Sequence, residues 1–179
     1  LDRMKLLKEI LYGTRIQDIL GNTHVAIEGL AFDSRKVKAF SLFVAMPGVH
    51  ADGHDFIEQA IDKGATAVVC EKLPERSDEK VTYVRVHNAA IALGNIASKF
   101  YDDPSESMKV IAITGTNGKT TTVSLLHRLF RSMDRRAGML STVENRVLDQ
   151  VVPASHTTPD AIQMQQLFRR MADAGCKYV

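Results

Sequence analysis

The sequence predicts an α/β protein of two domains: a small N-terminal α/β domain, then the opening part of a parallel-sheet domain. Short apolar runs typical of buried strands alternate along the chain with helix-like patterns. One such run, 110–113, leads through two glycines into an amphipathic helix. The polar stretch 102–107, which contains Pro104, is the clearest linker. We therefore expect domains at 1–104 and 105–179.

The elements of the two domains can be placed in order from the same patterns. In the first domain we expect one or two short helices in 5–20, strands at 25–32 and 41–46, a helix from Phe56 that stops at Gly64, strands at 65–70 and 81–86, and a helix at 89–100. In the second we expect a strand at 110–113 buried on both faces, a helix after Gly118, a strand at 137–142, a hairpin or irregular region at 143–153, a helix with Thr158 as N-cap followed by Pro159 and Asp160, and a strand from Cys176. The last strand stops at Val179, so we expect the chain to be truncated.

A glycine-containing loop at 114–121 joins the strand at 110–113 to the helix that follows. Gly115 and Gly118 let backbone N–H groups approach an anion, and the helix N-terminus adds its positive dipole end. In such a phosphate-binding loop, or P-loop, Lys119 reaches the β- and γ-phosphates and the Thr120 hydroxyl binds Mg²⁺. The usual template has an earlier first glycine, where this chain has Ile113. The alternative is an ordinary turn with a solvated Lys119.

The helix after this loop carries an apolar face and a basic cluster. We expect it to bury Val123, Leu126, Leu129, Phe130 and Met133. The cluster of Arg128, Arg131, Arg135 and Arg136 fits a solvated face and helix end better than a phosphate contact.

The composition excludes several classes of protein. The 179 residues carry a net charge of only +2 and no basic run interleaved with aromatics, so we expect no nucleic-acid partner. No apolar stretch is long enough to cross a bilayer, so we expect no membrane insertion, and we expect no signal peptide. Cys70 and Cys176 lie far apart without metal-ligand spacing, which favours buried thiols in a reducing cytoplasm. We expect a cytoplasmic monomer.

Three polar stretches allow a structural or a binding interpretation. Asp33-Ser34-Arg35 follows a predicted strand and could be a simple turn or a ligand contact. Residues 50–55 hold two histidines and two aspartates, and such a short cluster more often caps a helix or touches a ligand than binds a metal. At 156–158, capping explains Thr158 but does not require Thr157 or His156, which leaves a substrate contact open.

Taken jointly and in order, these stretches resemble the Mur ligase family over nearly all of residues 5–179. The resemblance rests on 114–121, on 33–35, on 43–45 and on 52–57, and Thr157-Thr158-Pro159-Asp160 is similar to the MurE type within that family. It implies an ATP-dependent enzyme of cytoplasmic peptidoglycan synthesis, and hence of cell-wall biogenesis, cell shape, cell cycle and cell division. Such an enzyme adds meso-diaminopimelate or L-lysine to UDP-N-acetylmuramoyl-L-alanyl-D-glutamate through an acyl phosphate.

The resemblance also assigns residues. It implies that the ATP phosphates are held by Gly115, Thr116, Asn117, Gly118, Lys119, Thr120 and Thr121, with Lys119 catalytic and Thr120 on Mg²⁺. It implies that the UDP-linked substrate is held by Ser34, His50, Ala51, Asp52, Thr157 and Thr158. Members of the family have three domains, so this chain alone is expected to lack ligase activity.

Three other functions stay open at this point. A MurF-type ligase, which adds D-alanyl-D-alanine, resembles the first domain closely. A non-catalytic nucleotide-sugar binding module would bind without turnover. A generic kinase or GTPase explains the loop at 114–121 but neither the linker nor the first domain.

Overall fold

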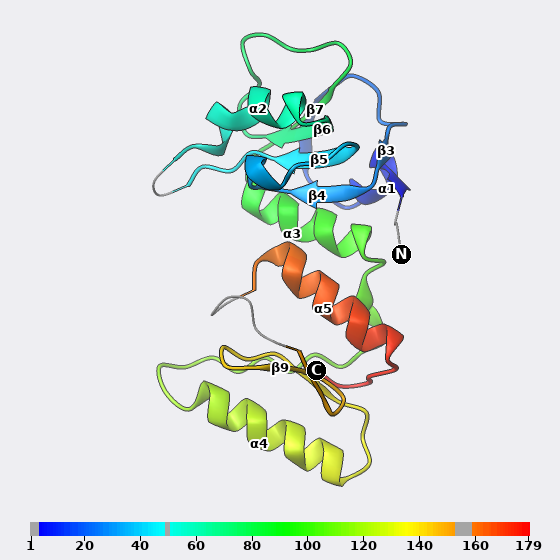
Figure 1. Cartoon of the computed structure of the whole chain (residues 1–179), viewed down its shortest axis with the longest axis vertical. Coiled ribbons are helices and arrows are strands. Elements are labelled where there is room, and N and C mark those ends of the chain that lie inside the picture. The colour runs from blue at the N-terminus through cyan, green and yellow to red at the C-terminus, as the bar shows by residue number, and fades with distance from the viewer. Residues whose placement is uncertain (1–3, 49–50, 153–158) are drawn as a thin grey trace. The chain divides into compact units, whose positions relative to one another are not determined.

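The computed structural model describes residues 4–48, 51–152 and 159–179, which form two compact units. The first unit spans Leu1–Phe100 and the second Tyr101–Val179. The division lies at the end of the helix expected at 89–100, close to the predicted linker. Each unit is an α/β assembly (Figure 1).

The first unit is built on a five-stranded sheet in the order β2-β7-β6-β5-β4. The strands are β2 (Ile16–Leu20), β4 (Gly29–Ala31), β5 (Ser41–Val44), β6 (Ala65–Cys70) and β7 (Thr82–Val86). Strands β4 to β7 are parallel, and β2 pairs antiparallel with β7 at one edge. All four residues of β5 are buried, as expected of a parallel strand covered on both faces.

Helices cover both faces of this sheet. Helix α2 (Ile57–Asp62) lies on one face and α3 (Ala89–Phe100) on the other (Figure 1). Under α2 the core contains Phe43, Val68 and Tyr83, packed with buried residues of the helix. The smaller elements are β1 (Lys5–Leu6), α1 (Leu7–Ile10), β3 (Ala26–Ile27), and the 3₁₀ turns η1 (Ser34–Lys36) and η2 (Gly53–Phe56).

One predicted element of this unit is wrong. The apolar residues of 16–20 suggest a helix, but the segment forms strand β2. Its backbone pairs with β7, from Ile16 opposite Val86 to Leu20 opposite Tyr83. Ile19 and Leu20 remain 38% and 48% exposed, so the apolar spacing does not mark a buried face. The free edge of β7 decides the conformation, which a local pattern does not reveal.

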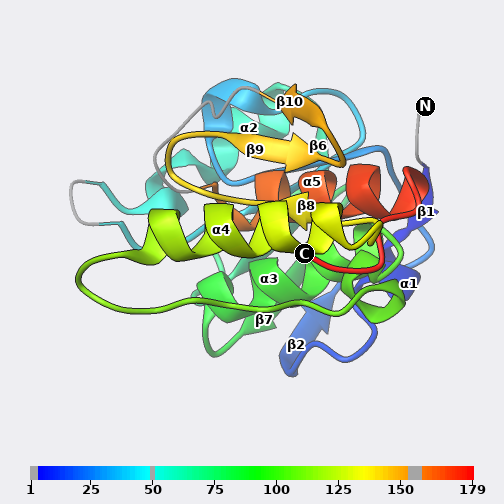
Figure 2. The same ribbon diagram turned by 90° about the horizontal axis from the view of Figure 1, so that it is seen from below.

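The second unit contains helices α4 (Lys119–Ser132) and α5 (Ala161–Asp173) and the 3₁₀ turn η3 (Pro104–Ser107). Its strands are β8 (Gly138–Met139), β9 (Asn145–Val147) and β10 (Gln150–Val152), which pair antiparallel in that order (Figure 2). Met108, Val147, Phe168, Met171 and Cys176 form its buried core. Helices α4 and α5 lie on opposite sides of the strands (Figure 1).

The segments 109–111 and 177–179 run parallel and pair through their backbones. Lys109 N–H donates to the Lys177 carbonyl at 2.8 Å, Val179 N–H to the Lys109 carbonyl at 3.0 Å, and Ile111 N–H to the Val179 carbonyl at 2.8 Å. On its other side, Tyr178 forms a parallel bridge with Ala137. The chain after Cys176 therefore lies between the segment before the glycine loop and β8.

The expectation that 110–113 is buried on both faces is wrong. Val110 and Ile111 are 47% and 45% exposed, and among the described residues the segment pairs along one side only. The buried face of α4 also differs: Leu129 and Met133 are more than half exposed, while His127 is buried. His127 Nε2 lies 3.1 Å from the Leu148 carbonyl, a partner that makes burial of an imidazole tolerable.

Helix α5 begins two residues later than predicted. Asp160, expected inside the first turn, is the N-cap: its carboxylate accepts from the Gln163 N–H at 2.8 Å, while the Gln163 side chain accepts from the Asp160 N–H. This reciprocal capping box satisfies two otherwise unpaired N–H groups. The expected cap, Thr158, lies outside the described residues. Over the described part of the chain, the helices are too short or too polar to span a bilayer.

Candidate functional site

The loop at 114–118 leads from the paired segment 109–111 into the N-terminus of α4. Gly118 is the N-cap residue with φ of 76°, a left-handed conformation that side chains rarely adopt. A Cβ on Gly118 would meet nothing within 4 Å, so the loop leaves open space there. The first helical hydrogen bond runs from Thr122 N–H to the Gly118 carbonyl, and the preceding N–H groups of the first turn have no intrahelical acceptor. The exposed helix start therefore fits an anion.

The side chain of Lys119 lies over this loop. Its Nζ donates to the Gly115 carbonyl at 2.6 Å. Gly115 itself has φ of 152°. The Gly115 carbonyl is therefore the acceptor that holds the ammonium group at the loop. A phosphate oxygen could take the place of this acceptor.

Thr120 has a neighbour that the sequence does not indicate. Its Oγ1 lies 3.5 Å from the Oγ1 of Thr142, which follows β8. Thr142 was expected only as the end of a strand. The available indication was its position, because polar residues at the carboxyl ends of parallel strands gather where ligands bind.

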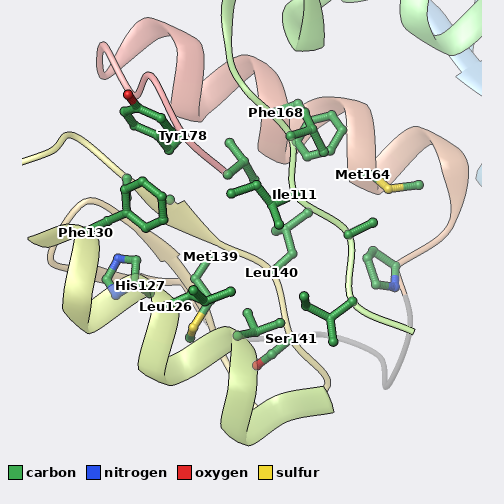
Figure 3. A pocket seen from close by; sticks show the side chains of 18 of the residues that line it. Ile111, Leu126, His127, Phe130, Met139, Leu140, Ser141, Met164, Phe168 and Tyr178 are labelled. Atoms are coloured by element: carbon green, nitrogen blue, oxygen red, sulfur yellow. The ribbon is translucent and has the colours of Figure 1, made fainter. Parts of the chain in front are cut away.

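An apolar cavity of about 430 Å³ lies beside the inner face of α4. Its walls include Ile111, Leu126, Phe130, Met139 and Phe168 (Figure 3). Ser141 and Thr142 bring polar groups to the lining, but residues 114–121 do not take part in it. The cavity therefore lies next to the loop at 114–118 but is not formed by it.

In the first unit, Ser34 is buried at the start of η1, the 3₁₀ turn that comes after β4. Its hydroxyl donates to Gln59 Oε1 at 2.6 Å, and its carbonyl accepts from Lys63 Nζ at 3.1 Å. Both partners belong to α2 or the residue after it. The sequence did not single out Gln59, and the structure shows that Ser34 is locked to α2 by it.

Asp33 and Arg35 form an ion pair at the start of η1. The Asp33 carboxylate caps the turn by accepting from the Arg35 N–H at 3.0 Å. It also accepts from Arg35 Nε at 2.9 Å and from Nη2 at 2.8 Å. The hydrogen bond from the Arg35 side chain is the main reason that the pKa of Asp33 falls to about 2. These contacts show the turn-forming role for Asp33.

The loop after β5 carries Ala51 and Asp52, which are also expected to bind substrate. Asp52 accepts from the His54 N–H at 3.0 Å and so caps η2, the first of the two alternatives for this cluster. The carbonyl of Ala51 accepts from the Gly48 N–H at 3.1 Å. His50, Thr157 and Thr158 lie outside the described residues. Thus Ser34, Ala51 and Asp52 belong to the first unit and the glycine-containing loop at 114–121 to the second.

The sequence of this chain matches two family models. The family model described as "Mur ligase family, catalytic domain" matches residues 26–101, and "Mur ligase middle domain" matches 113–179. The chain belongs to the Mur ligase family. The two matches lie on either side of the predicted linker at 102–107, and the resemblance to this family is confirmed.

Curated Mur ligases are similar to this chain over nearly its whole length. The UDP-N-acetylmuramoyl-L-alanyl-D-glutamate--2,6-diaminopimelate ligase of Cytophaga hutchinsonii is 51% identical over 96% of this chain and 36% of its own length. The protein of that name from Bacteroides fragilis is 46% identical over 97% of this chain and 36% of its own. The chain thus spans about a third of the length of these Mur ligases.

Solved Mur ligase structures share the fold. One with the same diaminopimelate ligase title aligns with a TM-score of 0.74 and 25% identity over 98% of this chain and 35% of its own. A structure titled UDP-N-acetylmuramoylalanyl-D-glutamyl-2,6-diaminopimelate--D-alanyl-D-alanyl ligase, from Acinetobacter baumannii, has a TM-score of 0.61 and 18% identity over 98% of this chain and 35% of its own. The mixed α/β architecture predicted from the sequence is confirmed.

Proposed function

We propose that this chain is part of a cytoplasmic ATP-dependent ligase that adds the third amino acid to UDP-N-acetylmuramoyl-L-alanyl-D-glutamate. The observation that carries the proposal is the 51% identity, over nearly the whole chain, to a protein named as the 2,6-diaminopimelate ligase for that substrate. The relatives' names favour diaminopimelate over L-lysine. Because the chain spans about a third of those relatives, the activity is proposed for the whole protein.

The phosphate loop supports the ATP part of the proposal. The open space beside Gly118 and the exposed N-terminus of α4, a helix of 14 residues, fit a polyphosphate. ATP supplies the phosphoryl group that activates the substrate carboxylate as an acyl phosphate. In our proposal the backbone of 115–121 holds the phosphates, Lys119 leaves the Gly115 carbonyl to bind phosphate oxygens, and the Thr120 hydroxyl binds Mg²⁺.

The first unit is proposed to hold the UDP-linked end of the substrate. Ser34, fixed to Gln59, and the segment Ala51-Asp52, fixed by its own turn, both follow the carboxyl ends of parallel strands of one sheet. In open α/β sheets this edge is where ligands bind. We propose that His50 belongs to the same contact, and that Thr157 and Thr158 contact the muramoyl-peptide part.

The test is calorimetric titration of the chain with UDP-muramoyl dipeptide and, separately, with UDP-muramoyl tripeptide. The proposal predicts tighter binding of the dipeptide form, the acceptor of the third residue. Preference for the tripeptide would instead assign the chain to a D-alanyl-D-alanine-adding ligase. Absence of binding by both would contradict the UDP-substrate role of the first unit.

A further inference from the structure

The imidazole of His54 joins two loops of the first unit at the ends of neighbouring parallel strands. His54 lies in η2, in the loop after β5, and its side chain is 13% exposed. Its Nδ1 lies 2.6 Å from Asp52 Oδ1. Its Nε2 lies 3.0 Å from the backbone nitrogen of Glu71 and 3.3 Å from that of Lys72, both in the turn after β6.

These partners determine where the ring carries its proton. The N–H groups of Glu71 and Lys72 can only donate, so Nε2 must offer its lone pair. Nδ1 must then carry the hydrogen and donate it to the Asp52 carboxylate. Hydrogen bonds from His54 to that carboxylate also lower the pKa of Asp52, which keeps it an acceptor. The arrangement therefore requires the neutral Nδ1–H form of His54.

The turn that the ring contacts is itself anchored. The Glu71 carboxylate accepts from the N–H of Ala89, the first residue of α3, at 2.9 Å. The loop after β5 is closed at its base, because Gly53 N–H donates to the Met46 carbonyl at 2.9 Å and Pro47 bridges to Asp52. A Cβ on Gly53 would lie 2.6 Å from the Met46 nitrogen, so the backbones are in close contact. The ring therefore links the loop after β5 to the turn after β6, and that turn is hydrogen-bonded to the start of α3.

We propose that His54, as a neutral Nδ1–H imidazole, is a positioning residue that holds Ala51 and Asp52 at the strand ends for contact with the UDP-linked substrate. The contact of Ala51 and Asp52 with this substrate rests on the proposed function. His54 itself does not have to touch the ligand, because its two nitrogens are engaged by protein groups. Its effect passes through the loop: with the ring in place, the segment 51–53 keeps one conformation before substrate arrives, which lowers the cost of binding.

Variants of His54 separate its contact with Asp52 from its contacts with the turn after β6. His54→Ala removes both contacts; His54→Asn keeps a donor near Asp52 but is too short to reach the β6 turn; His54→Gln can still offer an oxygen to that turn. We expect His54→Ala and His54→Asn to weaken binding of UDP-muramoyl dipeptide by about tenfold, because both variants lose the two hydrogen bonds to the turn after β6. We expect His54→Gln to weaken it less. His87→Gln, at an exposed histidine, is the matched control and should bind as the unchanged chain does.

Two measurements on the chain without ligand test the positioning role separately from the proposed function. Nitrogen NMR of the imidazole should show Nδ1 protonated and Nε2 as an acceptor; the opposite tautomer or a protonated ring near neutral pH would overturn the inference. Amide exchange at Gly53 should be faster in His54→Ala than in the control, and unchanged exchange would also overturn it. If the unchanged chain binds no UDP-linked peptide while both ligand-free results hold, the proposed function fails and the positioning of the loop stands.

Discussion

Lys119 Nζ donates a hydrogen bond to the carbonyl of Gly115, 2.6 Å away, so the lysine closes the phosphate loop onto itself. In the proposed function, a nucleotide phosphate takes the place of this neutral carbonyl and offers Lys119 an ionised acceptor. The exchange is favourable because an ionised acceptor forms a stronger hydrogen bond than a neutral carbonyl.

Lys119→Ala should weaken binding of Mg-ATP to the chain by tenfold or more, because hydrogen bonds to charged groups contribute about 1.5–3 kcal/mol. Isothermal titration measures the change. Lys109→Ala removes an exposed lysine from the neighbouring paired segment and serves as the control, with no expected effect. Equal ATP affinity in Lys119→Ala and the control would remove the loop from the proposed function.

Gly118→Ala and Gly94→Ala should change stability in opposite directions. Gly118 has φ of 76°, where alanine costs about 1–2 kcal/mol. Gly94 lies within α3, and a methyl group there would meet nothing within 4 Å, so alanine should stabilise by about 0.5–1 kcal/mol. Urea unfolding of the two variants compares them directly. Stabilisation by Gly118→Ala would show that the loop does not hold the left-handed conformation.

Cys70 and Cys176 should resist thiol reagents while the chain is folded. Both are buried, and burial raises the pKa of the Cys70 thiol to about 11 and that of Cys176 in the same direction. The thiolate is the reactive form, so both inaccessibility and a high pKa slow the reaction. A dithiobis-nitrobenzoate assay should release nothing rapidly in buffer and two equivalents in denaturant. One fast equivalent in buffer would contradict the placement of that cysteine.

The Asp33–Arg35 pair should stabilise the first unit only above strongly acid pH. The pKa of Asp33 is lowered from 3.8 to about 2 in the folded chain, so its contribution is present above pH 3.8 and is lost as the pH falls through 2. Asp33→Asn should therefore unfold at lower urea than the unchanged chain at pH 6, and the difference should vanish near pH 2.

A second variant checks the cause of this shift. Arg35→Gln removes the guanidinium whose hydrogen bond is the largest cause, so carbon NMR of the Asp33 carboxyl should show its pKa rising toward the ordinary value. Titration at the same pKa in both proteins would rule out Arg35 as the cause.

Elements set by local patterns could be predicted from the sequence. The helix at 89–100 has the expected bounds, because its apolar residues repeat with the helical period over three turns. The helix after Gly118 begins at Lys119, as the glycine loop predicts. In contrast, 16–20 becomes a strand because β7 offers it a free edge, and Val110 stays half exposed because its segment pairs along one side.

The sequence by itself determined the family, the glycine-containing loop at 114–121 and the order of most strands and helices, since each depends on residues near one another in the chain. Only the tertiary structure decided that Thr142 meets Thr120, that Gln59 holds Ser34, and that His54 reaches the turn after β6. Those contacts join residues 17 to 25 positions apart. Hydrogen bonds of that kind depend on how the strands align in the sheet, and a local sequence pattern does not contain that alignment.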